Sequence, residues 1–308
     1  MRTVEQRDAE RERREIVDRL VRIRARRPEA IAEAAANRVR PASLYGPTGK
    51  LLVIAADHPA RGALRAGADP LAMADRAELL RRLCRALARP EVTGVLGTAD
   101  IIEDLLLLGA LDGKAVIGSM NRGGLAGTVF EIDDRFTGYD ARTIAERGFE
   151  GGKMLLRVDP ADPATAPTLA ACADAVSQLA ARGLMAMVEP FLASRVNGRV
   201  RNTLTPEAVI RSITVASGLG VTSAYTWLKL PVVDDMERVL AASTLPVLIL
   251  GGEVPEDAEA TYRTWGRVLE LPTVQGLVVG RSLLYPADSD VDRALEAVAE
   301  LLSAKGAS

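Results

Sequence analysis

The chain alternates short apolar runs with longer amphipathic segments from residue 51 onward. The apolar runs lack the alternating polar positions of a half-exposed sheet, which is typical of parallel strands buried on both faces. The longer segments repeat apolar residues every three or four positions, which predicts helices. The predicted strands are 51–56, 93–96, 115–118, 153–158, 184–189, 224–230, 246–250 and 276–279, and the predicted helices are 70–89, 100–109, 138–148, 164–182, 206–219, 233–242, 256–270 and 289–304.

This succession of strand–helix units predicts the fold class. Eight such units in about 250 residues fit an α/β protein built as a (β/α)₈ TIM barrel. A doubly wound sheet is the alternative, but it would carry a glycine-rich dinucleotide turn after an early strand, and residues 57–61 do not have that pattern. We therefore predict a TIM-barrel domain over residues 46–308, preceded by an N-terminal helical extension over residues 1–45.

Residues 1–40 are rich in arginine and glutamate and predict an amphipathic helix, followed after Pro28 by a second short helix. Ile16, Leu20 and Ile23 recur at helical spacing. Charges of both signs are interleaved on the remaining positions, which indicates a solvated helix face rather than a nucleic-acid-binding arm. The apolar stripe must pack against the barrel or a neighbouring subunit, so we expect a homo-oligomer with this segment as the candidate contact.

Composition excludes several classes of protein. A chain of 308 residues with 48% hydrophobic and 26% charged residues is typical of a globular protein. A net charge of −2 and a pI of about 5.7 argue against nucleic acid as a partner. The N-terminus lacks a signal-peptide pattern and no apolar stretch of about 20 residues occurs, so we expect a cytoplasmic protein that does not cross a membrane. Cys84 and Cys172 lie in predicted helices and are expected in helical cores, without a disulfide.

The single histidine, His58, narrows the possible chemistry. Zinc sites usually draw on several His or Cys ligands, so a zinc-dependent enzyme is disfavoured. A Ser-His-Asp or Cys-His triad would have to use His58. We expect no metal and no cofactor.

Two lysines stand inside predicted strands, although the whole chain has only five. Lys229 lies in the apolar run from Ala224 to Pro231, and Lys153 lies in the run from Gly151 to Val158. Burial of an ammonium group is costly, so its pKa falls and the amine becomes nucleophilic near neutral pH. A Schiff-base lysine needs this property. The alternative is a strand-end lysine whose ammonium group reaches solvent.

The catalytic groups of a TIM barrel lie at the carboxyl ends of its strands. Polar or glycine-rich positions gather there, namely Asp57, His58 and Arg61 after the first strand, Lys153 in the fourth, Glu189 at the end of the fifth, Lys229 in the sixth, Gly251 and Gly252 after the seventh, and Gly280 and Arg281 after the eighth. The last four predict a phosphate site, because backbone N–H groups after the last two strands bind anions in many barrels. Each position also has a structural alternative, such as a helix cap, a rim ion pair or a tight turn.

A long connection covers residues 119–137 and contains the glycine-rich stretch from Asn121 to Gly127. Its glycines would allow either a close approach to a ligand or the movement of a lid. A flexible connection without function is the alternative.

These motifs together resemble the class I aldolases of the deoxyribose-phosphate and tagatose-bisphosphate aldolase superfamily, which includes the archaeal-type fructose-bisphosphate aldolases. The resemblance covers about residues 50–285. The matching stretches are Ala56-Asp57-His58-Pro59, Gly152-Lys153-Met154, Val188-Glu189-Pro190, Leu228-Lys229-Leu230-Pro231, Gly251-Gly252 and Val279-Gly280-Arg281. The resemblance implies that Lys229 forms the Schiff base and that Asp57, Lys153 and Glu189 assist proton transfers. Some members have tyrosine where this chain has Glu189, which is similar to the tagatose-bisphosphate branch.

Within this superfamily the chain most resembles actinobacterial aldolases of inositol breakdown. The implied reaction cleaves 2-deoxy-5-keto-gluconate 6-phosphate to dihydroxyacetone phosphate and malonate semialdehyde. Deoxyribose phosphate and fructose or tagatose bisphosphate are alternative substrates, and in each case the partner is a phosphorylated sugar. Two other functions use the same barrel: a phosphosugar isomerase or decarboxylase without a covalent step, in which Lys153 and Lys229 stabilise an enolate, and a non-catalytic sugar-phosphate-binding protein.

Overall fold

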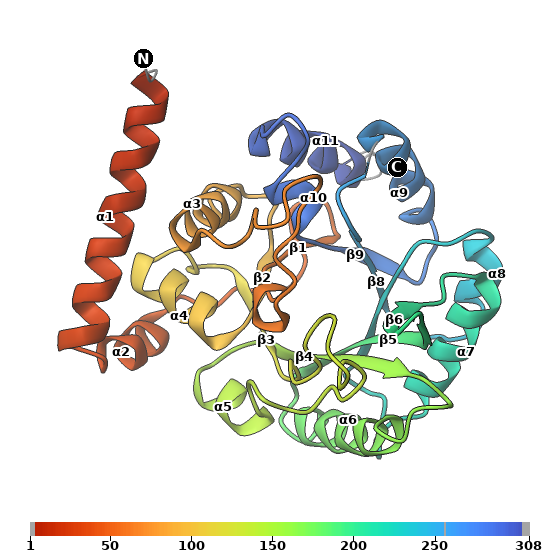
Figure 1. Cartoon of the computed structure of the whole chain (residues 1–308). Helices are drawn as coiled ribbons and strands as arrows, with labels where there is room; N and C mark the ends of the chain where they lie inside the picture. Colours follow the sequence, from red (N-terminus) through yellow and green to blue (C-terminus); the bar gives the residue numbers. More distant parts are fainter. Residues whose placement is uncertain (1–3, 256, 304–308) are drawn as a thin grey trace.

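The computed structural model describes residues 4–255 and 257–303 and contains a closed barrel of eight parallel strands (Figure 1). The barrel strands are β1 (Leu51–Ala55), β2 (Gly94–Gly97), β3 (Ala115–Ser119), β4 (Gly151–Val158), β5 (Met185–Val196), β7 (Thr226–Leu230), β8 (Val247–Leu250) and β9 (Val274–Val279). Each strand pairs in parallel with the next in this order, and β9 pairs with β1 to close the ring. The predicted TIM barrel is therefore confirmed.

Helices surround the barrel and connect its strands (Figure 1). They are α3 (Arg76–Leu87), α4 (Ala99–Leu108), α5 (Ala141–Glu146), α6 (Thr165–Ala180), α7 (Pro206–Ser217), α8 (Met236–Leu240), α9 (Ala258–Val268), α10 (Arg281–Leu284) and α11 (Val291–Ser303), with a 3₁₀ turn η1 (Pro59–Arg61). Local sequence sets their starts: the Asp75 side chain accepts a hydrogen bond from the Glu78 N–H and begins α3, and Thr205 begins α7 with Pro206 in its first turn. The predicted helices are present, and all are shorter than predicted except α4, which has the predicted length but begins one residue earlier; α10 and η1 were not predicted.

A few predictions extend beyond the described residues. Outside the described residues lie the first positions of the N-terminal extension and the last positions of the barrel domain. The same holds for position 256, where one predicted helix begins, and position 304, where another ends. Cys84 lies on α3 and Cys172 on α6, and both are unbridged. Among the helices of the described chain, none has the length and apolar character needed to span a membrane.

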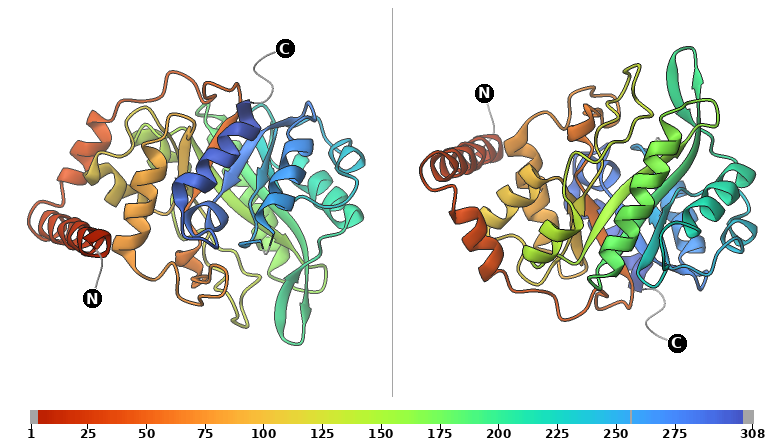
Figure 2. Two further views of the ribbon diagram at one scale, coloured as in Figure 1. Left: turned by 90° about the horizontal axis from the view of Figure 1, so that it is seen from above. Right: turned by 90° about the horizontal axis from the view of Figure 1, so that it is seen from below.

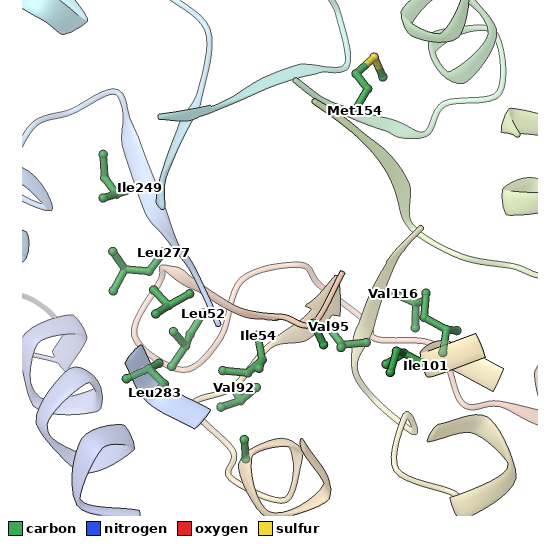
Figure 3. Close-up of a cluster of buried hydrophobic side chains, with 14 of the residues drawn as sticks. Leu52, Ile54, Val92, Val95, Ile101, Val116, Met154, Ile249, Leu277 and Leu283 are labelled. Carbon is green, nitrogen blue, oxygen red and sulfur yellow. The ribbon is translucent and has the colours of Figure 1, made fainter. Parts of the chain in front are cut away.

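The barrel strands have two apolar faces. Side chains on the outer face, such as Leu52, Ile54, Val95 and Val116, point away from the barrel axis toward the helices (Figure 3). The inner face carries a second apolar cluster, made of Leu51, Val53, Ala55, Leu96, Ile117, Met185, Met187, Leu248 and Val278. This two-faced burial explains the unbroken apolar runs in the sequence.

The inner apolar cluster supports a polar layer at the carboxyl ends of the strands. Successive side chains of a strand alternate between its faces, so a residue two positions after an inward-facing residue also points inward. Ala55 is followed in this way by Asp57, Ile117 by Ser119 and Met187 by Glu189, which places these polar groups directly above the apolar cluster.

The N-terminal helices lie outside the barrel, beside α3 and α4 (Figures 1 and 2). They are α1 (Val4–Arg26) and α2 (Ala30–Asn37). Leu20 is buried, and Arg24 donates hydrogen bonds to Asp104 at 3.0 and 2.8 Å. Val17 and Val21 remain exposed on the outer side of α1. One face of α1 therefore packs against the barrel helices, and a subunit contact through this segment stays a prediction.

One hairpin was not predicted. Strand β5 continues past the barrel to Val196, turns at Asn197 and Gly198, and returns as β6 (Arg199–Asn202) in antiparallel pairing. Both turn residues have positive φ, 52° and 77°, which suits a two-residue Asn-Gly turn between twisted strands. Figure 2 shows the hairpin projecting beyond the body of the barrel. The Asn-Gly pair was an available signal for it.

Candidate active site

One acidic and two basic side chains, all buried, meet in the polar layer. Strand β5 carries Glu189, and the neighbouring strands β4 and β7 carry Lys153 and Lys229. Glu189 Oε1 lies 2.8 Å from Lys229 Nζ, and Glu189 Oε2 contacts Lys153 Nζ. Both lysines are almost completely buried, with Lys229 only 3% exposed. One carboxylate therefore bridges two amines.

The charges of this trio favour a neutral amine. Burial lowers the pKa of Lys229, although the Glu189 carboxylate acts in the opposite direction. Burial and the Arg122 charge lower the pKa of Lys153 well below its ordinary value. Burial alone would raise the pKa of Glu189, but the nearby Lys153 and Lys229 charges hold it well below its ordinary value. With the neighbouring pair of Asp57 and Arg122, the buried layer holds two carboxylates for three cationic groups, so one amine is favoured in its neutral form.

Asp57 is held by groups from three neighbouring elements. Its Oδ2 atom accepts a hydrogen bond from Ser119 Oγ at 3.0 Å, lies 3.3 Å from Lys153 Nζ and forms an ion pair with Arg122. Arg122 Nε also donates to Ser119 Oγ at 3.0 Å. Burial lowers the pKa of Arg122 to about 10, so its guanidinium still carries a charge at neutral pH. Sequence reasoning identified Asp57 and Lys153 but missed Arg122 and Ser119.

A cavity of about 450 Å³ opens above these groups. Lys229, Glu189 and Asp57 line it, together with the other predicted site residues His58, Arg61, Gly251, Gly252, Gly280 and Arg281. Lys153 is absent from the lining residues of the described chain and lies behind Glu189 and Asp57. Of the two lysines, Lys229 is therefore the one placed to meet a ligand.

The loops after β8 and β9 form the glycine-rich wall of this cavity. Gly252 has a φ of +67°, and the space where a Cβ would stand is open to 4 Å. Gly251 is needed for packing, because a Cβ would lie 2.5 Å from Val279 Cγ1, and a Cβ at Gly280 would collide with the Ala55 carbonyl oxygen. Arg281 Nη2 donates to the Gly252 carbonyl oxygen at 3.3 Å. An arginine beside an open glycine backbone suits an anionic oxygen-rich group.

His58 and Arg61 also lie on the cavity wall, but they differ in charge and in hydrogen bonding. Burial, followed by the charges of Arg281 and Lys229, lowers the pKa of His58 well below its ordinary value, so the imidazole is neutral at pH 7. Arg61 Nε donates to the Gly124 carbonyl oxygen at 2.9 Å, so the loop after β3 already engages its guanidinium. His58 thus offers the cavity a neutral polar group, and Arg61 helps to form the wall.

The connection 119–137 is anchored at its base. Asn121 donates to the Leu155 carbonyl oxygen at 2.6 Å and accepts from the Leu155 N–H at 2.7 Å. Arg157 on β4 is buried and bonds to both carboxylate oxygens of Asp134 at 2.8 and 2.7 Å, and its Nη1 donates to Glu131 at 3.2 Å. The inner part of the connection is therefore a fixed wall of the cavity. Arg157 follows Lys153 and Leu155 at two-residue spacing on β4, so its inward direction could have been predicted from the sequence.

The carboxylates of the site are engaged by cations. Within residues 4–255 and 257–303, no group of three or more His, Cys, Asp or Glu side chains is arranged to hold a metal ion.

Comparison with known proteins identifies related structures. A family model described as Cgl0159-like matches residues 49–299. The crystal structure of Cgl0159 from Corynebacterium glutamicum is 51% identical, with a TM-score of 0.91 over 94% of this chain and 97% of that chain. No curated protein matches the chain in sequence.

Two more distant structures share the fold. An archaeal fructose 1,6-bisphosphate aldolase is 20% identical, with a TM-score of 0.63 over 89% of this chain and 99% of that chain. Another archaeal fructose-1,6-bisphosphate aldolase structure, whose catalytic lysine is covalently bound to the carbinolamine intermediate of its substrate, is 19% identical with the same TM-score and coverage. At these identities the likeness shows a common TIM-barrel architecture.

Proposed function

The chain belongs to the Cgl0159-like family, and from the site of this member we propose that it is a class I aldolase that acts on a phosphorylated keto sugar. The observation that carries the proposal is the buried amine of Lys229, which lies on the cavity wall 2.8 Å from the Glu189 carboxylate. The proposal is also supported by the barrel fold that this chain shares with aldolases of known Schiff-base chemistry.

The covalent step starts from neutral Lys229. Its amine attacks the substrate ketone to give a carbinolamine, and loss of water gives an iminium. Glu189 is within hydrogen-bond distance of Lys229 Nζ, so it can accept a proton from the attacking amine and return it to the departing hydroxyl. Lys153, which contacts the other oxygen of Glu189, keeps this carboxylate in place.

Carbon–carbon cleavage follows from the iminium. A base removes the proton of the substrate hydroxyl, the carbon–carbon bond breaks, and its electron pair passes to the iminium to form an enamine. Four carboxylates of the described chain line the cavity. Asp57 and Glu189 belong to the polar layer around the lysines and can take this proton, whereas Glu131 pairs with Arg61 and Arg157, and Glu253 with Arg281. The aldehyde leaves, the enamine is protonated, and water releases the ketone product and restores Lys229.

The substrate phosphate is assigned to the glycine-rich wall. Gly252 and Arg281, with the neighbouring Gly251 and Gly280, would bind it and so orient the carbonyl on Lys229. The resemblance noted in the sequence suggests 2-deoxy-5-keto-gluconate 6-phosphate as substrate, with dihydroxyacetone phosphate and malonate semialdehyde as products. Fructose 1,6-bisphosphate, the substrate named for the distant structures, is the second compound to test.

A cleavage assay tests this function. Purified protein is incubated with each of these two compounds and with deoxyribose 5-phosphate, and release of dihydroxyacetone phosphate or of acetaldehyde is followed by coupled NADH oxidation. We expect one of them to be cleaved, and Lys229→Met to abolish the reaction. Absence of cleavage of all three, in folded protein that binds dihydroxyacetone phosphate, would contradict the proposed reaction.

A further inference from the structure

The β5–β6 hairpin forms a wall of the cavity that faces the distal part of a bound substrate. It contributes Val200, Arg201 and Asn202, and Leu204, which follows β6, adds to the same wall. In the ring order of the barrel, β7 with Lys229 stands between this hairpin and the glycine-rich wall at β8 and β9. A substrate bound to Lys229 by its carbonyl and to Gly252 and Arg281 by its phosphate would therefore direct its remaining half toward the hairpin.

Arg201 differs from the other arginines of the cavity wall in its charge partners. The other four each have a carboxylate partner: Arg61 pairs with Glu131, Arg122 with Asp57, Arg157 with Asp134, and Arg281 with Glu253. Over the described part of the chain, Arg201 has neither a hydrogen bond nor an ion pair from its side chain. A ligand can therefore supply the counter-charge of Arg201 without displacing a protein carboxylate.

The hairpin holds Arg201 in place. Arg201 pairs with Ser194 in the antiparallel register of β5 and β6. The neighbouring Arg195 donates to Asp162 at 3.1 Å and to the Val129 carbonyl oxygen at 2.7 Å, so β5 is tied at this point to two other loops. A guanidinium carried on a tethered strand loses less freedom on binding than one on a mobile loop.

We propose that Arg201 binds an anionic group on the aldehyde half of the substrate. This inference rests on the proposed aldolase function, because it takes the carbonyl position from Lys229. The planar guanidinium matches a carboxylate or a phosphate. The substrate class is then a ketose phosphate that carries a second anionic group at its opposite end.

The chain provides a matched control for this assignment. Arg199 lies two residues earlier on the same strand and is also exposed, but it is not among the lining residues of the cavity in the described structure. Arg199→Gln removes the same charge from the same hairpin without touching the wall. A general effect of hairpin charge would therefore appear in both variants, whereas a specific contact appears in one.

The test is aldol condensation with dihydroxyacetone phosphate and three aldehydes: malonate semialdehyde with a carboxylate, glyceraldehyde 3-phosphate with a phosphate, and neutral glyceraldehyde. For Arg201→Gln, we expect kcat/KM with the preferred charged aldehyde to fall about 10- to 100-fold, mainly through KM, as for loss of a hydrogen bond to a charged group. The value with glyceraldehyde should stay within about twofold, since it makes no such bond. Arg199→Gln should match the wild type with all three, and the wild-type preference between the two charged aldehydes tells carboxylate from phosphate.

Two results would overturn the assignment. One is an equal loss with neutral and charged aldehydes in Arg201→Gln, and the other is the same loss in Arg199→Gln. Failure of the proposed function gives a different result, because the wild type would then condense none of the three aldehydes, and the inference would fall with it.

Discussion

Lys153 and Lys229 lie on either side of Glu189, and both contact its carboxylate. Their strand positions could be predicted from the sequence, since a lysine inside an apolar strand is rare and costly. Their shared partner could also be expected from the end of the fifth strand. Lys229 lines the cavity and Lys153 does not. This difference depends on how the side chains pack in the folded protein, so it could not be predicted from the sequence.

Replacement of Lys229 by methionine should separate activity from stability. We expect Lys229→Met to have no measurable aldolase activity, because the nucleophile is lost. Glu189 keeps Lys153 as its partner, so the free energy of unfolding should be unchanged or higher by about 1–2 kcal/mol, as when a buried charge gives way to an apolar side chain. Urea unfolding and the cleavage assay measure both. A loss of several kcal/mol would show that Lys229 has a structural role, and retained activity would show that it is not the nucleophile.

Replacement of Glu189 should lower both the activity and the free energy of unfolding. Glu189→Gln removes the carboxylate that contacts the buried Lys229 and leaves Lys153 with Asp57 alone, so we expect a loss of about 3 kcal/mol of unfolding free energy. Loss of the proton relay should lower kcat by about 10²- to 10⁴-fold in protein shown to be folded. Asp57→Asn serves as the comparison, because Asp57 does not contact Lys229 in the described structure. A Glu189→Gln enzyme with nearly normal kcat would assign the proton transfers to Asp57.

The pH dependence of imine formation follows from the lowered pKa of Lys229. The neutral amine reacts, so the rate should rise with pH through this pKa and level off below pH 10.5, the ordinary lysine value. The charge of Glu189 raises the pKa of Lys229, so Glu189→Gln should move the rise to lower pH. Rates of adduct formation with dihydroxyacetone phosphate and cyanoborohydride measure this. A rise centred near 10.5 in the wild type would mean that burial does not activate the amine.

At the scale of elements, periodicity predicted every barrel strand but not the two segments that shape the cavity. Strand β6 is short and exposed, so it lacks an apolar pattern, and only its Asn197-Gly198 turn signals it. The connection 119–137 has no regular pattern, because buried ion pairs and close glycine contacts fix it rather than a helix or strand.

The anchor of this connection can be tested with two adjacent aspartates. Asp134 is fully buried and bonds to Arg157, so Asp134→Asn should lower the free energy of unfolding by about 2–3 kcal/mol and raise KM as the wall loosens. Asp133 pairs with the exposed Arg135, so Asp133→Asn should cost less than about 0.5 kcal/mol. Urea unfolding compares the variants. Equal stability of the two variants would mean that the buried network does not anchor the connection.

At the scale of the whole molecule, the fold follows from the order and spacing of apolar runs, and the site follows from the barrel geometry that brings strand ends together. Nine of the ten predicted site residues line one cavity, and Lys153 lies behind its wall. The supporting groups Arg122, Ser119 and Asp134 were not predicted, because their partners are distant in sequence and come close only in the folded chain.

The proposed reaction needs no metal, because the iminium accepts the electrons of the broken bond. We therefore expect kcat and KM to be unchanged after dialysis against EDTA. Steady-state kinetics before and after dialysis measure this. A loss of activity that added Mg²⁺, Mn²⁺ or Zn²⁺ restores would indicate enolate stabilisation by a metal ion.

Borohydride trapping with dihydroxyacetone phosphate, followed by peptide mass mapping, tests the central claim most directly. The account predicts one reduced adduct on Lys229, none in Lys229→Met, and no adduct on Lys114, a lysine outside the cavity. An adduct on Lys153 would keep the covalent chemistry and contradict the assigned nucleophile. No adduct on any lysine, in folded enzyme that cleaves its substrate to dihydroxyacetone phosphate, would contradict the Schiff-base mechanism.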